Sequence, residues 1–192
     1  ILFNNSTINR RSSLSWNGFA KVDLTEGLYF KSNLSYEKYD YNVKEYNNAQ
    51  YGQASSVQGR VQKSKDTSET INFINALHYD KTIDDHHFAA DGIVEAYRFK
   101  QDLFHASSTG YLPGNTEIGS GTALESIEGY EVEDRLTSYL GRISYDYNNA
   151  YFIEGSFRRD SSTRFDKSVR AGNFYSIGGS WIVSSEDFLA NL

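Results

Sequence analysis

Apolar and polar residues alternate in seven stretches of this 192-residue chain, and the connections between the stretches switch between very short and very long. The alternating stretches occupy residues 14–24, 28–37, 71–80, 87–96, 138–147, 151–158 and 175–183. Successive side chains of a β-strand point to opposite faces, so a period of two predicts seven strands, each with one apolar and one polar face.

The connections distinguish between the folds that such strands can form. Tight links at 25–27, 82–86 and 148–150 contain Gly, Asn or Asp, which supply the backbone freedom of hairpin turns. Long connections run over 40–68 and 101–133, with a shorter arm over 160–173. A compact soluble domain rarely carries two loops of that length, whereas outer-membrane barrels pair short periplasmic turns with long extracellular loops. We therefore predict an all-β fold, an antiparallel up-and-down meander that forms part of a transmembrane β-barrel, with about seven strands and long extracellular loops.

The aromatic content agrees with this prediction. Aromatic residues make up 15% of the chain, with 15 Tyr and 12 Phe, and such rings form the belts where a barrel wall meets lipid headgroups. We expect Tyr79, Tyr145, Tyr147 and Tyr151 to form a belt near the short turns. Aromatic residues also favour strands of soluble proteins, so a β-sandwich core remains an alternative. No apolar run approaches the roughly 20 residues of a membrane-spanning helix.

Charge and cysteine content exclude several classes of function. A net charge of −6 without a basic stripe argues against a nucleic-acid partner. The absence of Cys removes disulfides and thiolate metal sites. The chain begins without Met or a signal peptide, and residues 187–192 resemble a short helical turn. Bacterial single-chain barrels close with an even number of strands, so we expect seven strands to be part of a longer protein.

The C-terminal third carries a specific series of motifs. Its elements are Tyr145-Asp146-Tyr147-Asn148-Asn149-Ala150-Tyr151, Glu154, Ser156, Arg158-Arg159-Asp160, Ser161-Ser162-Thr163-Arg164-Phe165, Phe174-Tyr175-Ser176-Ile177-Gly178-Gly179-Ser180-Trp181 and Glu186-Asp187-Phe188-Leu189. In order and spacing this series resembles the SusC/RagA class of TonB-dependent outer-membrane transporters of Bacteroidetes. The chain departs from that pattern at Ser161, Ala171 and Ile182, and residues 1–134 resemble the class in architecture only.

The resemblance implies a function for the whole protein. Residues 1–192 would be a segment of a TonB-dependent receptor β-barrel, with the plug domain and the remaining strands outside it. The barrel would import an oligosaccharide or a peptide together with a SusD-like surface lipoprotein, and TonB–ExbB–ExbD would supply energy through the plug. The expected location is the outer membrane of a Gram-negative, Bacteroidetes-like bacterium, with the wall in contact with membrane lipid.

Alternation assigns the side chains of the last three strands to two faces. The polar, lumen-facing candidates are Arg142, Ser144, Asp146, Glu154, Ser156 and Arg158. These side chains could equally form salt bridges with one another across the strands. The apolar, lipid-facing candidates are Tyr139, Ile143, Tyr145, Ile153, Phe157, Ile177 and Trp181. A family-motif loop contributes Arg159, Asp160, Ser162, Arg164 and Phe165, whose charges could hold the loop in place or meet an anionic ligand.

Other candidate sites carry weaker signals. Asp84, Asp85, His86 and His87 are adjacent in a tight turn, where side chains diverge, so a solvated turn is favoured over a metal site. Neither a G-x-S-x-G nucleophile turn nor a phosphate loop is present. We expect no enzyme activity, no cofactor and no metal. Alternatives to the importer are a passive porin or adhesin barrel and a soluble β-sandwich that binds glycans.

Overall fold

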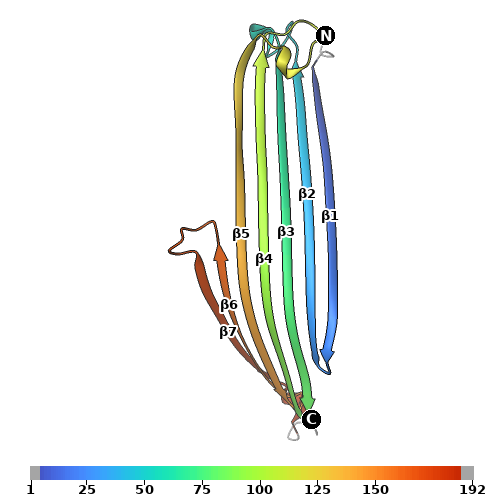
Figure 1. Ribbon diagram of the computed structural model, residues 1–192, viewed down its shortest axis with the longest axis vertical. Helices are drawn as coiled ribbons and strands as arrows, with labels where there is room; N and C mark the ends of the chain where they lie inside the picture. Colours follow the sequence, from blue (N-terminus) through green and yellow to red (C-terminus); the bar gives the residue numbers. More distant parts are fainter. Residues whose placement is uncertain (1–4, 187–192) are drawn as a thin grey trace. The chain divides into compact units, whose positions relative to one another are not determined.

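Seven strands form one sheet in the computed structural model, which describes residues 5–186. The strands are β1 (Ser6–Thr25), β2 (Leu28–Asn47), β3 (Arg60–Ile83), β4 (His86–Thr109), β5 (Ala123–Tyr147), β6 (Tyr151–Ser162) and β7 (Ala171–Trp181). They lie side by side in chain order, and neighbouring strands run in opposite directions (Figure 1). The predicted antiparallel meander of about seven strands is confirmed.

Helical structure in residues 5–186 is limited to three short 3₁₀ turns. These are η2 (Ser55–Val57), η3 (Ile118–Ser120) and η4 (Val183–Ser185). No helix in this part of the chain has the length and apolar character needed to cross a membrane. The helical turn predicted at 187–192 lies outside the described residues.

The first five strands are longer than the alternation predicts, so the predicted loop boundaries are wrong. The connections span 48–59, 110–122 and 163–170, rather than 40–68, 101–133 and 160–173. Apolar–polar alternation reveals a strand only where one of its faces is apolar. In the extra segments both faces are largely polar, while pairing with the neighbouring strands continues.

The tight turns have backbone geometry that their residues allow. In the β5–β6 turn, Ala150 N–H donates to the Tyr147 carbonyl at 3.0 Å. Asn148 and Asn149 have φ of 51° and 52°, the positive values that a type I′ hairpin needs at both central positions. Gly27 in the β1–β2 turn has φ of 74°, and a Cβ there would lie 1.9 Å from the Asp80 carbonyl oxygen. Only glycine fits that position.

Backbone hydrogen bonds join the tight turns to their neighbours. Asp80 N–H donates to the Gly27 carbonyl at 2.7 Å, and Asn148 N–H donates to the Asp85 carbonyl at 2.7 Å. Ile182 N–H donates to the Ala150 carbonyl at 2.8 Å. The short turns therefore lie on one rim of the sheet, as predicted.

The chain divides into two compact units. Unit 1 comprises the described parts of Ile1–Trp16, Tyr36–Thr70 and Phe99–Glu133, and unit 2 comprises those of Asn17–Ser35, Ile71–Arg98 and Asp134–Leu192. Unit 1 has a small apolar core, in which Tyr46, Val61 and Tyr111 pack with Ile118. In unit 2, Ala150 is the one buried apolar residue among those described. Most apolar side chains of unit 2 are therefore exposed.

Candidate functional site

The candidate site consists of the two faces of β5, β6 and β7 in unit 2. The antiparallel register pairs Ile143 with Gly155, and Gly155 with Ile177. In the adjacent positions it pairs Ser144 with Glu154. Because neighbouring positions point to opposite faces, all seven lipid-facing candidates share one face and all six lumen-facing candidates share the other. The register thus places the two sets on opposite faces of the sheet, while their contact with lipid and lumen stays a prediction.

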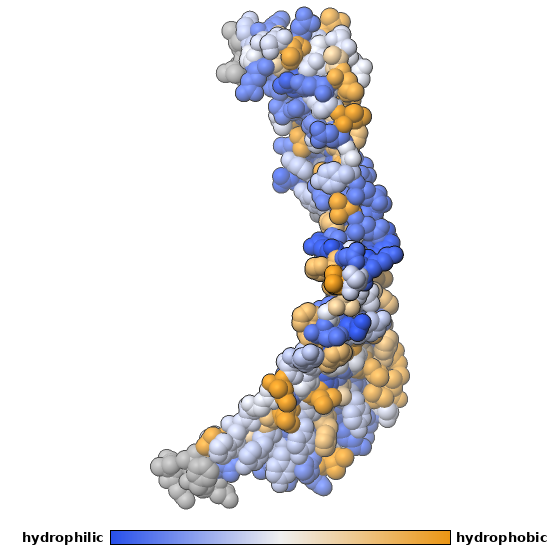
Figure 2. Space-filling model, turned by 90° about the vertical axis from the view of Figure 1, so that its left-hand side faces the viewer, coloured by the Kyte–Doolittle hydropathy of each residue, from blue (hydrophilic) through white to orange (hydrophobic). Residues whose placement is uncertain are grey.

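The apolar face is uncovered by the described chain. Ile177 is 83% exposed, Tyr175 is 80% exposed and Ile143 is 67% exposed. Figure 2 shows exposed apolar side chains beside polar ones on the surface that it presents. Contiguous exposed apolar surface of this kind marks an interface with an apolar partner or a membrane.

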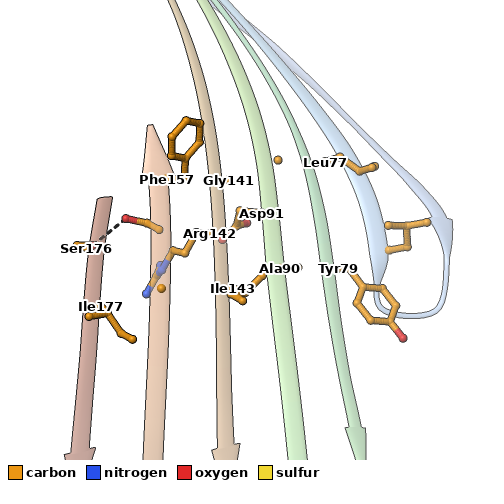
Figure 3. Close-up of a pocket in the computed structure, with 14 residues that line it drawn as sticks. Leu77, Tyr79, Ala90, Asp91, Gly141, Arg142, Ile143, Phe157, Ser176 and Ile177 are labelled. Atoms are coloured by element: carbon orange, nitrogen blue, oxygen red, sulfur yellow. Dashed lines mark hydrogen bonds between the residues drawn. The ribbon is translucent and has the colours of Figure 1, made fainter. Parts of the chain in front are cut away.

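A shallow hollow of about 590 Å³ lies on this apolar face. Figure 3 shows Ile143, Phe157 and Ile177 among the side chains around it. Gly141 and Gly155 also line it, and a Cβ at Gly141 would have no other atom within 4 Å. The hollow therefore exists because glycines replace larger side chains between apolar ones.

Aromatic rings cluster beside the short turns. Tyr147 stacks with Tyr151 at a centroid distance of 6.3 Å, and Tyr151 stacks with Trp181 at 6.2 Å. The rings of Phe88 and Tyr145 have a centroid distance of 4.9 Å. These rings lie on adjacent strands, so they form a continuous row rather than isolated contacts. The row includes three of the four tyrosines predicted to form a belt.

The polar face is held by ion pairs between strands and within β6. Arg142 contacts Glu154 at 2.6 Å, and Arg158 contacts Asp160 at 2.7 Å and Glu95 at 3.5 Å. Arg158 also donates to the Ser138 hydroxyl at 3.1 Å. Mutual salt bridging, which the sequence left open for these side chains, is thus present.

A histidine bridge on the same face was not predicted from the sequence. His87 contacts Asp146 through Nδ1 at 2.6 Å and Asp80 through Nε2 at 2.8 Å. His86, its neighbour in the sequence, contacts the Tyr145 hydroxyl at 2.7 Å. No group of three or more metal-ligating side chains occurs within residues 5–186. Asp80 and Asp146 lie near the ends of β3 and β5, close to the short turns, and His87 lies at the start of β4 between these strands. Their positions in the sequence could have indicated the bridge.

The family-motif residues are divided between a strand and a loop, which corrects the prediction. Arg159, Asp160 and Ser162 belong to β6, whereas Arg164 and Phe165 follow it. Arg164 contacts Asp134 at 2.6 Å, and Thr163 N–H donates to the Arg135 carbonyl at 2.9 Å. The loop is therefore attached to β5, and within it Arg170 donates to the Phe165 carbonyl at 3.4 Å.

Unit 1 contains a second ordered arrangement that the sequence did not reveal. Lys44 contacts Glu117 at 2.9 Å and Lys63 contacts it at 3.0 Å. These hydrogen bonds from two ammonium groups lower the pKa of the Glu117 carboxyl to about 2. Together, Lys44, Lys63 and Glu117 form a clamp between β2, β3 and the 110–122 connection. From sequence alone these residues appeared only in long polar loops.

Arg60 joins β3 to the start of β5, directly after the same connection. Its Nε and Nη2 donate to the two carboxylate oxygens of Glu125 at 2.7 and 2.5 Å. Ser107 donates to Glu125 at 2.6 Å, and these bonds lower the pKa of that carboxyl. Tyr111 N–H donates to the Gln58 carbonyl at 2.7 Å, which joins the two connections directly. The connections of unit 1 are thus an ordered platform.

No protein-family model matches the chain, but individual proteins do. A TonB-dependent receptor of Formosa agariphila is 24% identical over 96% of this chain and 18% of its own length. The TonB-dependent receptor SusC of Bacteroides thetaiotaomicron is 36% identical over 63 residues, which are 33% of this chain and 6% of the relative.

Solved structures agree with these relatives on the fold. The RagAB peptide transporter superimposes with a TM-score of 0.90 at 22% identity, over 96% of this chain and 21% of the other. The ferric preacinetobactin receptor BauA of Acinetobacter baumannii gives a TM-score of 0.55 at 10% identity, over 95% of this chain and 29% of the other. The chain thus spans about a fifth of the length of its relatives. In its motifs, its sequence and its fold, the chain is similar to a segment of the SusC-like TonB-dependent receptors.

Proposed function

We propose that this chain forms part of the barrel wall of an outer-membrane importer. In this proposal the apolar face of unit 2 contacts lipid, and the polar face lines the lumen. The plug and the remaining strands are contributed by the rest of the protein, and TonB–ExbB–ExbD drives uptake. The cargo is an oligosaccharide or a peptide, received with a SusD-like lipoprotein at the outer surface of a Bacteroidetes-like bacterium.

One observation carries the proposal, namely an exposed apolar face opposite a polar face with internal ion pairs. Burying an Ile or Phe side chain away from water is worth roughly 1.5–3 kcal/mol, so this face is unfavourable in water. Strands that cross a membrane need about 9–11 residues, and the apolar alternation covers about that length in β2, β3, β4 and β5. The aromatic row beside the short turns suits a headgroup boundary.

The alternatives differ in their support. A soluble β-sandwich needs a second sheet, and residues 5–186 form a single sheet. A passive porin or an adhesin would have the same wall. The relatives named TonB-dependent receptors favour energised uptake over both.

Site-directed labelling tests the lipid-facing assignment. This chain has no Cys, so Ile143→Cys and its neighbour Ser144→Cys each introduce one thiol, on opposite faces. In the full-length protein, with any other cysteines replaced and the protein in lipid vesicles, a nitroxide label at 143 should be relaxed by oxygen. A label at 144 should be relaxed instead by a water-soluble nickel chelate. Equal accessibility of both labels to the nickel chelate would contradict the proposal.

Uptake requires a separate measurement. A strain that produces the full-length protein should accumulate its cargo only while TonB is present. Uptake that persists without TonB would indicate a passive porin, and a complete lack of uptake would favour an adhesin.

A further inference from the structure

A pocket in unit 1 lies where β1 and β2 meet the 48–59 and 110–122 connections. Its volume is about 380 Å³, which is within the range of small-molecule sites. The side chains on which the argument depends are Ser6, Tyr46, Asn48, Gln50, Pro113 and Thr116. We call these six residues the amide pocket.

Tyr46 provides the observation that points to a ligand. The residue is only 6% exposed, because its ring packs with Val61 and Tyr111. Its hydroxyl forms no hydrogen bond within residues 5–186. In that part of the chain, Asn72 Oδ1 is the one fully enclosed side-chain atom without a partner, so the Tyr46 hydroxyl reaches the space of the pocket that the residue lines. A buried tyrosine hydroxyl usually has a hydrogen-bond partner, and a bound ligand would supply it.

Three further side chains of the amide pocket are able to bond a ligand. Ser6 and Gln50 are exposed, and their side chains have no hydrogen-bond partner in the described part of the chain. The Thr116 hydroxyl accepts a hydrogen bond from the Lys44 ammonium at 3.2 Å, so its own proton stays available to donate. Together with Tyr46, these residues offer several donors and acceptors around one small volume.

Asn48 fixes the wall of the pocket rather than serving the ligand. Its Oδ1 accepts from the backbone N–H groups of Gln50 and Tyr51, both at 2.9 Å. Its Nδ2 donates to Asn5 Oδ1 at 2.5 Å. These bonds hold the start of the 48–59 connection beside the start of β1. The side chains that would meet a ligand are therefore held in place before it binds, which lowers the entropic cost of binding.

We propose that the amide pocket binds an uncharged sugar unit of a glycan. None of its described lining residues is charged, so the pocket has no group to pair with a carboxylate, an ammonium or a phosphate. A sugar hydroxyl donates and accepts at once, as the hydroxyls and the amide of the lining do, and Pro113 offers apolar surface to the C–H groups of the ring. The inference goes beyond the proposed function, because it concerns one pocket within unit 1, whatever the cargo and whichever face contacts lipid.

A peptide is the alternative ligand, and the lining favours a sugar over it. Peptides are held mainly by main-chain bonds to a strand edge, by grooves for their side chains or by groups that pair with their charged ends. The amide pocket instead presents side-chain hydroxyls and an amide to its ligand and has no charged residue for a peptide terminus. Clustered groups that both donate and accept match adjacent hydroxyls more closely than a backbone in which N–H only donates.

The test removes the Tyr46 hydroxyl and keeps the ring in the core. Tyr46→Phe is made in the full-length protein, purified in detergent and titrated by calorimetry with neutral trisaccharides of glucose, galactose, mannose and xylose. Tyr111→Phe is the matched control, because Tyr111 belongs to the same apolar core while its hydroxyl bonds Ser108 and the Ile118 carbonyl. A trisaccharide of galacturonic acid and a trialanine with blocked ends are the comparison ligands.

We expect wild type to bind at least one neutral trisaccharide, and Tyr46→Phe to bind it about five- to tenfold more weakly through the loss of one hydrogen bond. Tyr111→Phe should bind the sugar as wild type does. Without sugar, Tyr46→Phe should unfold at the same denaturant concentration as wild type, since no internal bond is lost, whereas Tyr111→Phe should unfold earlier. This contrast separates loss of the ligand contact from loss of structure.

Three results would overturn the inference. They are no binding of any neutral trisaccharide, equal binding by wild type and Tyr46→Phe, and tighter binding of the acidic trisaccharide or of the blocked trialanine. Uptake that does not depend on TonB would refute the proposed function and would leave the calorimetric result unchanged, so the two failures are distinguishable.

Discussion

The depth of a substitution on the apolar face provides a quantitative prediction. Ile143 lies midway between Tyr139 and Tyr147 on that face of β5. In the proposed barrel wall, four residues at about 3.3 Å each, with a tilt of about 45°, would place Tyr147 roughly 9 Å from Ile143 along the membrane normal. Since the apolar band of a barrel is about 25 Å tall, the proposal puts Ile143 near its centre and Tyr147 near its edge.

Arginine at these positions should therefore have different costs. Ile143→Arg should reduce the free energy of unfolding by about 2–4 kcal/mol, and Tyr147→Arg by about 0–1 kcal/mol. Ser144→Arg, on the polar face across from Glu154, should cost close to nothing. The measurement is guanidinium unfolding of the full-length protein in phospholipid vesicles, followed by tryptophan fluorescence. Equal costs at 143 and 147, or a larger cost at 144 than at 143, would refute the assignment of faces and depth.

Two further predictions concern a turn and the clamp. Gly27→Ala should destabilise the protein by about 2–3 kcal/mol, because it adds strain at positive φ and a collision with a backbone carbonyl. Gly52→Ala, also at positive φ but with open space around it, should cost only about 1–2 kcal/mol in the same unfolding measurement. Equal losses of stability in the two variants would show that the collision with the carbonyl contributes nothing. Glu117 has a pKa lowered to about 2 by Lys44 and Lys63, so its contribution is present above its ordinary pKa and is lost as the pH falls through about 2. Pepsin should therefore cleave the 110–122 connection faster in Glu117→Gln than in wild type near pH 4, and this difference should be much smaller near pH 2. A difference that is already absent near pH 4 would argue against the clamp.

The faces of the strands could be read from the sequence because alternation is a local property. Ile143 and Ser144 point to opposite faces in any extended strand. The tight turn at Asn148 and Asn149 was likewise predictable, since few residues tolerate positive φ. These features need no knowledge of which strands become neighbours.

The ends of the strands and the contacts between them could not be read in this way. Residues such as Asp66 and Gln101 lie in the parts of β3 and β4 that are polar on both faces, so no apolar period marks them. Gln101 nevertheless joins β4 to Asp66 of β3 through a hydrogen bond of 3.0 Å. The bridge from His87 to Asp80 and Asp146 depends on which strands are neighbours in the sheet.

The sequence by itself determined the period of two, the positions of the tight turns and the family motifs of residues 135–192, because each depends on residues close together in the chain. Only the tertiary structure decided the register, the clamp at Glu117 and the amide pocket, because these bring together side chains from segments that are far apart in the sequence. Their physical basis is strand pairing, which places distant residues a few ångströms apart without leaving a local pattern.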